Sequence, residues 1–234
     1  MSKSHAVKQT AGAIFAAAVC LLAGCTLLYV TDTHITGTPK PQSFGVAEGV
    51  AALGLVAPVG LQGFAPLLSN ALNTALEEAR PPIRVISFQE TINLLNDRGL
   101  AVDYADLVSG FTRSGILDRE RLGRIGAALN CRYVLLPGLA EFDHQVIDRF
   151  EAMGLKVVRN RVITLRVWLQ LWDTKTGHDL WESAGEVTAV TALLTARRTA
   201  PLDKIAQTLW LRMIQDNLIG GQTNVNIFFE NREQ

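Results

Sequence analysis

The chain has 234 residues, of which 48% are hydrophobic and 19% are charged, with 22 basic and 22 acidic side chains. This hydrophobic fraction is typical of a globular protein and excludes wholesale disorder, and three cysteines are too few for a disulfide framework. The balanced charge argues against a nucleic-acid-binding protein, which usually carries a basic excess.

The N-terminus has the pattern of a secretory signal peptide. Two lysines precede an almost purely apolar run over residues 11–23, which is too short to span a bilayer as an anchor helix. The run ends in Leu22-Ala23-Gly24-Cys25, and these four residues resemble the lipobox of bacterial lipoproteins. The resemblance implies that a signal peptidase recognises the first three of these residues, that residues 1–24 are removed, and that Cys25 carries covalent lipid, palmitate among it. No other cofactor is expected.

A lipidated Cys25 predicts where the protein resides. Two or more acyl chains give stable membrane anchoring. The next residue is Thr26, not the aspartate that retains lipoproteins at the inner membrane in enterobacteria-like sorting, so an outer-membrane, periplasm-facing location is implied. After cleavage Cys131 is the remaining unmodified thiol. It begins an apolar run, and we expect it to be a small buried side chain.

Composition divides the mature chain into three parts. Residues 25–44 are predicted to be the lipidated cysteine and a flexible tether, because this stretch has no apolar period and two nearby prolines favour extended chain. One globular domain is expected over residues 45–218. Residues 219–234 are predicted to be a polar C-terminal tail.

The first half of the domain alternates strands with helices. An apolar run predicts a strand over Val50–Pro58, leucines and alanines spaced by three and four predict a helix over Phe64–Ala79, and a second strand is expected over Ile83–Ile86. Three short helices follow, each expected to begin at a residue that can cap it: Ser87, Asp103 and Asp118.

The second half predicts a β-meander and a final helix. A third strand is expected over Cys131–Leu136, and Arg161–Trp172 alternates cleanly between apolar and polar residues. A tight turn at residues 173–177 returns the chain as a partner strand to Thr188, and an amphipathic helix spans Leu202–Leu218. The order β-α-β-α-α-α-β, then a β-meander and a C-terminal helix, predicts an α/β (α+β) fold with one mixed sheet and helices packed on it.

Three segments together resemble the CsgG/LpoB/TolB N-terminal-domain-like group of envelope proteins over about residues 50–218. They are Val50–Ala79, Gly115–Leu135, and the hairpin from Leu165 to Glu182 with its Asp-Thr-Lys-Thr-Gly turn. Asn130 stands where these proteins often place glycine, and asparagine tolerates the same left-handed helix end. The group includes periplasmic lipoproteins that activate peptidoglycan synthases and subunits of the curli secretion channel, so the resemblance implies protein contact in the cell envelope.

The sequence lacks the usual patterns of catalysis and metal binding. His144 and His178 are isolated from other metal-ligating residues, no serine lies in a nucleophile elbow, and no glycine pattern for phosphate binding occurs. We therefore expect no metal and no enzymatic activity.

One strand face is the candidate partner surface. It comprises four residues on the non-core side of the alternating strand: Arg166, Trp168, Gln170 and Trp172. Either a helix or a neighbouring strand buries the two tryptophan rings, or the tryptophans and the arginine form an interface, where these residue types are enriched.

The main hypothesis is an outer-membrane-anchored adaptor or regulatory module that binds an envelope protein of unknown identity; a homo-oligomer stays open. The alternative is a subunit of a CsgG-like secretion channel, with membrane hairpins at residues 143–161 and 188–202. The many charges in the first segment and the shortness of the second weigh against it. A third alternative is a periplasmic protein that binds lipid or a small ligand.

Overall fold

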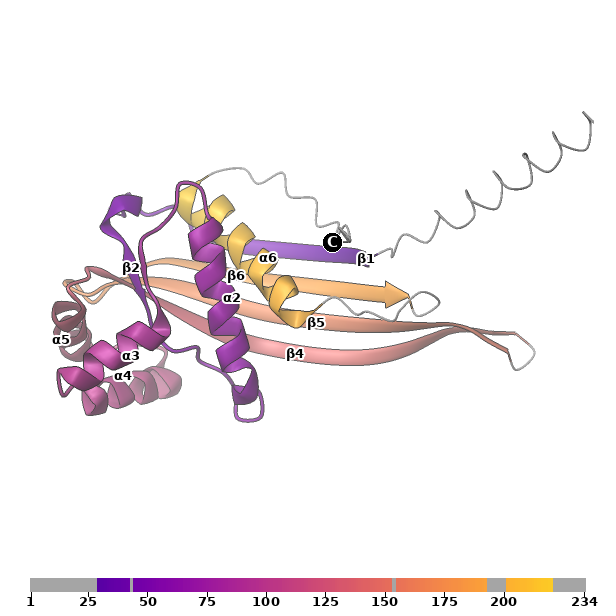
Figure 1. The fold of residues 1–234 in the computed structure, drawn as a ribbon, viewed down its shortest axis with the longest axis horizontal. Coiled ribbons are helices and arrows are strands. Elements are labelled where there is room, and N and C mark those ends of the chain that lie inside the picture. The colour runs from indigo at the N-terminus through magenta and orange to yellow at the C-terminus, as the bar shows by residue number, and fades with distance from the viewer. Residues whose placement is uncertain (1–28, 43, 153–154, 193–200, 221–234) are drawn as a thin grey trace, which may run out of the picture.

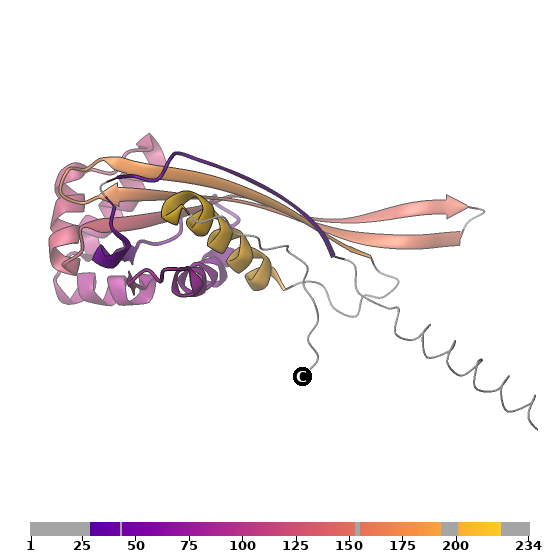
Figure 2. The ribbon, with the colours of Figure 1, turned by 90° about the horizontal axis from the view of Figure 1, so that it is seen from above.

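The computed structural model describes residues 29–42, 44–152, 155–192 and 201–220. One six-stranded mixed sheet, in the order β1-β6-β5-β4-β2-β3, runs through the molecule with helices on both faces (Figures 1 and 2). The predicted fold class is confirmed.

The first β-α-β unit is close to its prediction. β2 (Val50–Ala52) lies parallel to β3 (Val85–Ile86), and α2 (Ala65–Glu78) connects them. The predicted strand over residues 50–58 is too long. The backbone N–H of Gly54 donates to the Tyr104 hydroxyl at 2.7 Å, so the chain leaves the ladder there and rejoins β4 only at an isolated bridge between Val56 and Gly138.

Three helices gather at one end of the sheet (Figure 1): α3 (Phe88–Asp97), α4 (Ala101–Ser114) and α5 (Arg119–Leu129). Two predicted caps are confirmed. Ser87 Oγ accepts the N–H of Glu90 at 3.3 Å, and Asp118 Oδ1 accepts the N–H of Arg121 at 2.9 Å. Each satisfies a backbone donor that the helix leaves unpaired at its first turn.

The third cap differs from its prediction. α4 begins at Ala101, so Asp103 lies in the first turn and not at the cap. Its carboxylate instead accepts from Arg124 of α5 at 2.5 Å, which ties the two helices together. Asn130 ends α5 with φ 49° and ψ 44°, the left-handed conformation expected of it.

The meander consists of β4 (Tyr133–Ala152), β5 (Leu155–Asp173) and β6 (Asp179–Ala192), each antiparallel to the next. β4 and β5 are far longer than predicted and leave the sheet as a two-stranded ribbon (Figure 1). Residues 144–147 of β4, at the base of this ribbon, are exposed. A strand without a buried face has no reason to alternate apolar and polar residues, so the alternation that predicted β5 stopped at Arg161.

The predicted tether over residues 25–44 contains a strand. β1 (Tyr29–Gly37) pairs antiparallel with β6 along its whole length, from Tyr29 opposite Thr191 to Gly37 opposite Ser183. β-Branched and aromatic residues favour this conformation, and Ile35 packs against the core.

Two hydrophobic cores lie on the two faces of the sheet. α2 and α6 (Leu202–Arg212), which continues as a π-helix over Met213–Ile219, cover one face (Figure 2). Against them pack the β5 side chains predicted to face inward: Leu165, Val167, Leu169 and Leu171. α3, α4 and α5 cover the end of the opposite face. The predicted tail lies outside the described residues from residue 221 onward.

Candidate functional site

The predicted partner surface on β5 is divided by the helices. Trp172 is only 5% exposed within the core under α3, α4 and α5. Trp168 is half-buried, with its ring centroid 5.7 Å from that of Phe111 on α4. A Cβ added to Gly138 of β4 would lie 1.8 Å from the Trp168 ring, so this glycine makes room for the indole. The helices therefore cover the tryptophans, one of the two outcomes expected for them.

Arg166 remains at the surface, where the sheet continues beyond the helices. Its Nε lies 2.7 Å from Glu186 of β6, and its other contact is with Glu141 of β4 at 2.5 Å. The hydrogen bond that Arg166 donates to Glu186 and the charge of Glu141 raise the pKa of the Arg166 guanidinium above its ordinary value. All three side chains are more than a third exposed, so this cluster crosses three strands as a solvated polar face.

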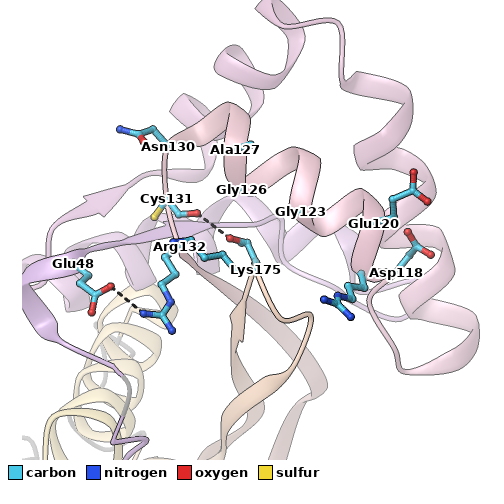
Figure 3. Close-up of a pocket in the computed structure, with 12 residues that line it drawn as sticks. Glu48, Asp118, Glu120, Gly123, Gly126, Ala127, Asn130, Cys131, Arg132 and Lys175 are labelled. Atoms are coloured by element: carbon cyan, nitrogen blue, oxygen red, sulfur yellow. Dashed lines mark hydrogen bonds and ion pairs between the residues drawn. The ribbon is translucent and has the colours of Figure 1, made fainter.

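A groove at the helical end of the sheet was not predicted. It has a volume of about 940 Å³ and lies between α5, the β5–β6 turn and the short 3-10 helix at Val46–Glu48. Figure 3 shows its lining: Glu48, Asp118, Arg119, Glu120, Gly123, Gly126, Ala127, Asn130, Cys131, Arg132, Thr174 and Lys175.

Two glycines of α5 bring the helix against the turn. A Cβ added to Gly126 would lie 2.3 Å from Thr174 Oγ1, whereas one added to Gly123 would meet only the Thr174 carbonyl at 3.5 Å. The Thr174 hydroxyl is itself engaged, since it donates to the Cys131 carbonyl at 3.2 Å. The groove floor is therefore backbone and small side chains, which are fixed in place.

A buried carboxylate holds the turn beside the groove. Asp173 Oδ2 accepts from Arg132 Nε at 3.0 Å, and its Oδ1 accepts the N–H groups of Lys175 at 2.8 Å and Thr176 at 3.2 Å. Burial by itself raises the pKa of Asp173, but these N–H donors and the guanidinium outweigh it and hold that pKa below its ordinary value. The aspartate stays ionised and fixes the conformation of the groove wall.

The groove carries charges of both signs and an inert thiol. Arg132 lies 3.8 Å from Glu48 (Figure 3), and Lys175, which also lines the groove, is exposed. Cys131 is 8% exposed, its Sγ donates to the Tyr133 carbonyl at 3.2 Å, and burial raises its thiol pKa. This confirms the predicted burial of Cys131 and argues against a thiolate nucleophile.

Within the described residues no group of three or more histidine, cysteine or acidic side chains is placed to hold a metal ion. His144 and His178 are both exposed.

The predicted anchor lies outside the described residues. Cys25 and the residues expected to direct its cleavage, Leu22, Ala23 and Gly24, all precede Tyr29, where the description begins. In the part of the chain that is described, no helix combines the length and the apolar character needed to cross a membrane.

No family model and no curated protein matches the chain. Among solved structures it is similar to a PelC dodecamer subunit from Paraburkholderia phytofirmans (TM-score 0.44, 12% identity, 82% of this chain and 100% of that one). It is also similar to lipoprotein GNA1162 from Neisseria meningitidis, with a TM-score of 0.42 and 13% identity over 72% of this chain and 99% of that one. The LpoB C-terminal domain from Salmonella enterica gives a TM-score of 0.36 and 13% identity over 62% of this chain and 86% of that one. One of these neighbours is named as a lipoprotein, and at these scores and identities none of them assigns a function to this chain.

Proposed function

We propose that this protein is an outer-membrane-anchored, periplasm-facing lipoprotein that acts as a protein-interaction module of the cell envelope. The observation that carries the proposal is the position of the sheet relative to Cys25. β1 begins at Tyr29, four residues after that cysteine, so the sheet starts within about 14 Å of the lipid attachment point.

If Cys25 is anchored as proposed, the strand register determines which end of the domain would face the membrane. Tyr29 lies opposite Thr191, which lies opposite Arg161, which lies opposite Val146. From that level β4 continues to Ala152, six residues further or about 20 Å. The β4–β5 ribbon therefore extends at the anchored end, and the groove lies at the opposite end, away from the bilayer.

A partner that approaches from the periplasm would meet the groove first. Its walls offer exposed cations and carboxylates, and its floor is held by the Asp173 turn and by Gly126. A rigid surface with charges of both signs suits a protein partner with a complementary pattern, because paired charges set the orientation of binding.

In-cell photo-crosslinking tests this proposal. A benzoylphenylalanine at Lys175, on the groove wall, is expected to crosslink an envelope protein, whereas the same group at the exposed Glu77 of α2 is expected to crosslink none. Both substitutions replace an exposed charged side chain. Crosslinking at neither position, or equally at both, would contradict the assignment of the groove.

The long β4–β5 ribbon favours a second candidate, a subunit of an oligomeric outer-membrane channel. Strands that span an outer membrane need about 9–11 residues, and β4 continues 14 residues beyond its last bridge to the β2 side of the sheet, at Gly138. Charges along residues 148–161 weigh against a lipid-facing strand. Conductance in planar bilayers, with ring-shaped particles in detergent, would favour the channel; their absence would leave the adaptor.

A further inference from the structure

One edge of the sheet has no partner strand in the described part of the chain. β1 pairs with β6 on one side and is the last strand of the sheet on the other. Its nine residues therefore present backbone N–H and C=O groups along a free edge. Such an edge is a template for another strand, and proteins usually cover it.

The chain leaves the described domain near the C-terminal end of β1. Lys40 Nζ donates to the Ile219 carbonyl at 3.3 Å, and Asn217 Nδ2 donates to Ser183 Oγ at 3.2 Å. Ser183 in turn donates to the Thr36 carbonyl near the end of β1. Gly220 then adopts φ 81° and ψ 30°, a left-handed conformation that turns the chain. A segment that runs back from here along β1 would be antiparallel to it.

The sequence after Gly220 suits a strand. Val225, Ile227 and Phe229 share one face of an extended chain, and the other face carries asparagines at 224 and 226 followed by Phe228. The alternation over residues 224–227 and the β-branched and aromatic residues favour a strand with one buried face. Residues 224–230 extend over about 24 Å, which matches most of the length of β1, about 30 Å. The segment is therefore less polar than the tail expected over residues 219–234.

We propose that residues 224–230 of this chain bind along β1 as a seventh, antiparallel strand. Ile35 and Thr33 of β1 lie opposite Gly185 and Val187 of β6, on the face that α6 covers. Apolar side chains at 225, 227 and 229 extend this core if they share that face. A slip of one residue would turn them toward the other face, beside Asp32 and His34, so the pattern selects the register.

The chain's own segment is the favoured occupant because of where it starts. It begins a few residues from the edge, so binding in cis closes only a short loop and costs little conformational entropy. A strand from another protein would have to displace it. This inference does not depend on the envelope location.

Hydrogen exchange on the full-length protein tests the proposal with two matched variants. Ile227→Asp places a charge on the face expected to be buried, and Asn226→Asp places the same charge on the opposite face. We expect alternate backbone amides of β1 to exchange roughly tenfold faster in I227D, with no change in N226D. Amides of β5 residues 163–171 report whether each variant remains folded.

Equal β1 exchange in the parent and both variants would overturn the proposal. So would β1 protection that rises with protein concentration together with dimers in sedimentation, because the occupant would then be a second copy. If I227D also exposes β5, the Ile35→Cys/Val225→Cys pair decides: an intramolecular disulfide on oxidation supports the strand. A disulfide that forms no faster than with Ile35→Cys/Asn226→Cys contradicts it.

Discussion

At the scale of single residues, Asp173 shows how one side chain fixes a wall of the groove. Its two carboxylate oxygens accept from Arg132 and from two backbone N–H groups of the turn. We expect Asp173→Asn to lower the free energy of unfolding by about 1–2 kcal/mol at pH 7. Urea unfolding curves of the parent and the variant measure this change in the free energy of unfolding. The matched control is Asp97→Asn at the exposed end of α3, which should change stability by less than about 0.5 kcal/mol.

The difference, or gap, in the free energy of unfolding between the parent and Asp173→Asn should depend on pH. The pKa of Asp173 is lowered in the folded state, so its charge stabilises the fold fully above the unfolded pKa of about 3.9. That contribution is lost as pH falls through the lower, folded pKa. Unfolding curves at pH 8 and pH 5 should therefore show the same gap, and the gap should shrink below about pH 4. A gap that instead widened in acid would contradict this role.

Cys25 and Cys131 are the same residue type with opposite expected roles. Acylation of Cys25 would anchor the protein, whereas Cys131 is buried and its thiol pKa is raised. We expect Cys25→Ser to abolish metabolic labelling with palmitate and to release the protein from the membrane fraction. Cys131→Ser is the control and should keep the label. Retention of label in the Cys25 variant would refute lipidation at that position.

At the scale of elements, the packing of α5 on the β5–β6 turn predicts opposite effects for two similar substitutions. Glycine inside a helix normally costs stability relative to alanine. Gly123→Ala should therefore stabilise the protein by up to about 1 kcal/mol, because its added methyl meets only ordinary contact distances. Gly126→Ala should destabilise it by about 1–3 kcal/mol, because its methyl overlaps the buried Thr174. Thermal unfolding of the pair measures both, and effects of the same sign would contradict the close approach.

Elements whose conformation depends on residues close to them in the sequence could be predicted. α2, α3 and α5 follow their helical spacing, and the caps at Ser87 and Asp118 are confirmed. β1 was missed because its threonines and the prolines beyond it resemble a linker, while its pairing with β6 connects residues about 150 positions apart. The composition around β1 gives no indication of a partner strand so far away in the sequence.

The groove could not be predicted because separate segments build it. Glu48, residues 118–132 and the turn at 173–177 come together only when β2, β4 and β5 form one sheet. Two sequence features could have indicated it: the Gly123-x-x-Gly126 spacing on a helix, and the Asp-x-x-Thr-Gly turn. The β5 tryptophans predicted a different site, on the outer face of that strand, because the pattern of one strand does not show which helix covers it.

At the scale of the whole molecule, the two ends of the sheet differ in structure. Five α-helices, counted over the described residues, cover its middle and one end, and the β4–β5 ribbon forms the other end (Figures 1 and 2). β1 starts at the ribbon end and Cys25 precedes it by four residues. A lipid at Cys25 would therefore orient the domain, because β1 is a fixed strand and not a long flexible linker.

Orientation on a bilayer is the prediction that follows. A fluorophore on Ile147→Cys, at the ribbon end, should be quenched by nitroxide lipids labelled in the headgroup, since this residue lies one position beyond the level of Tyr29. A fluorophore on Lys175→Cys, beyond the other end of β5, should not be quenched, because residues 161 and 173 of β5 are about 40 Å apart. Both side chains are exposed and Cys131 is buried, so labelling is selective. Equal quenching would mean that the domain lies flat or tumbles at its anchor, and stronger quenching at residue 175 would place the groove against the membrane and contradict its assignment to a periplasmic partner.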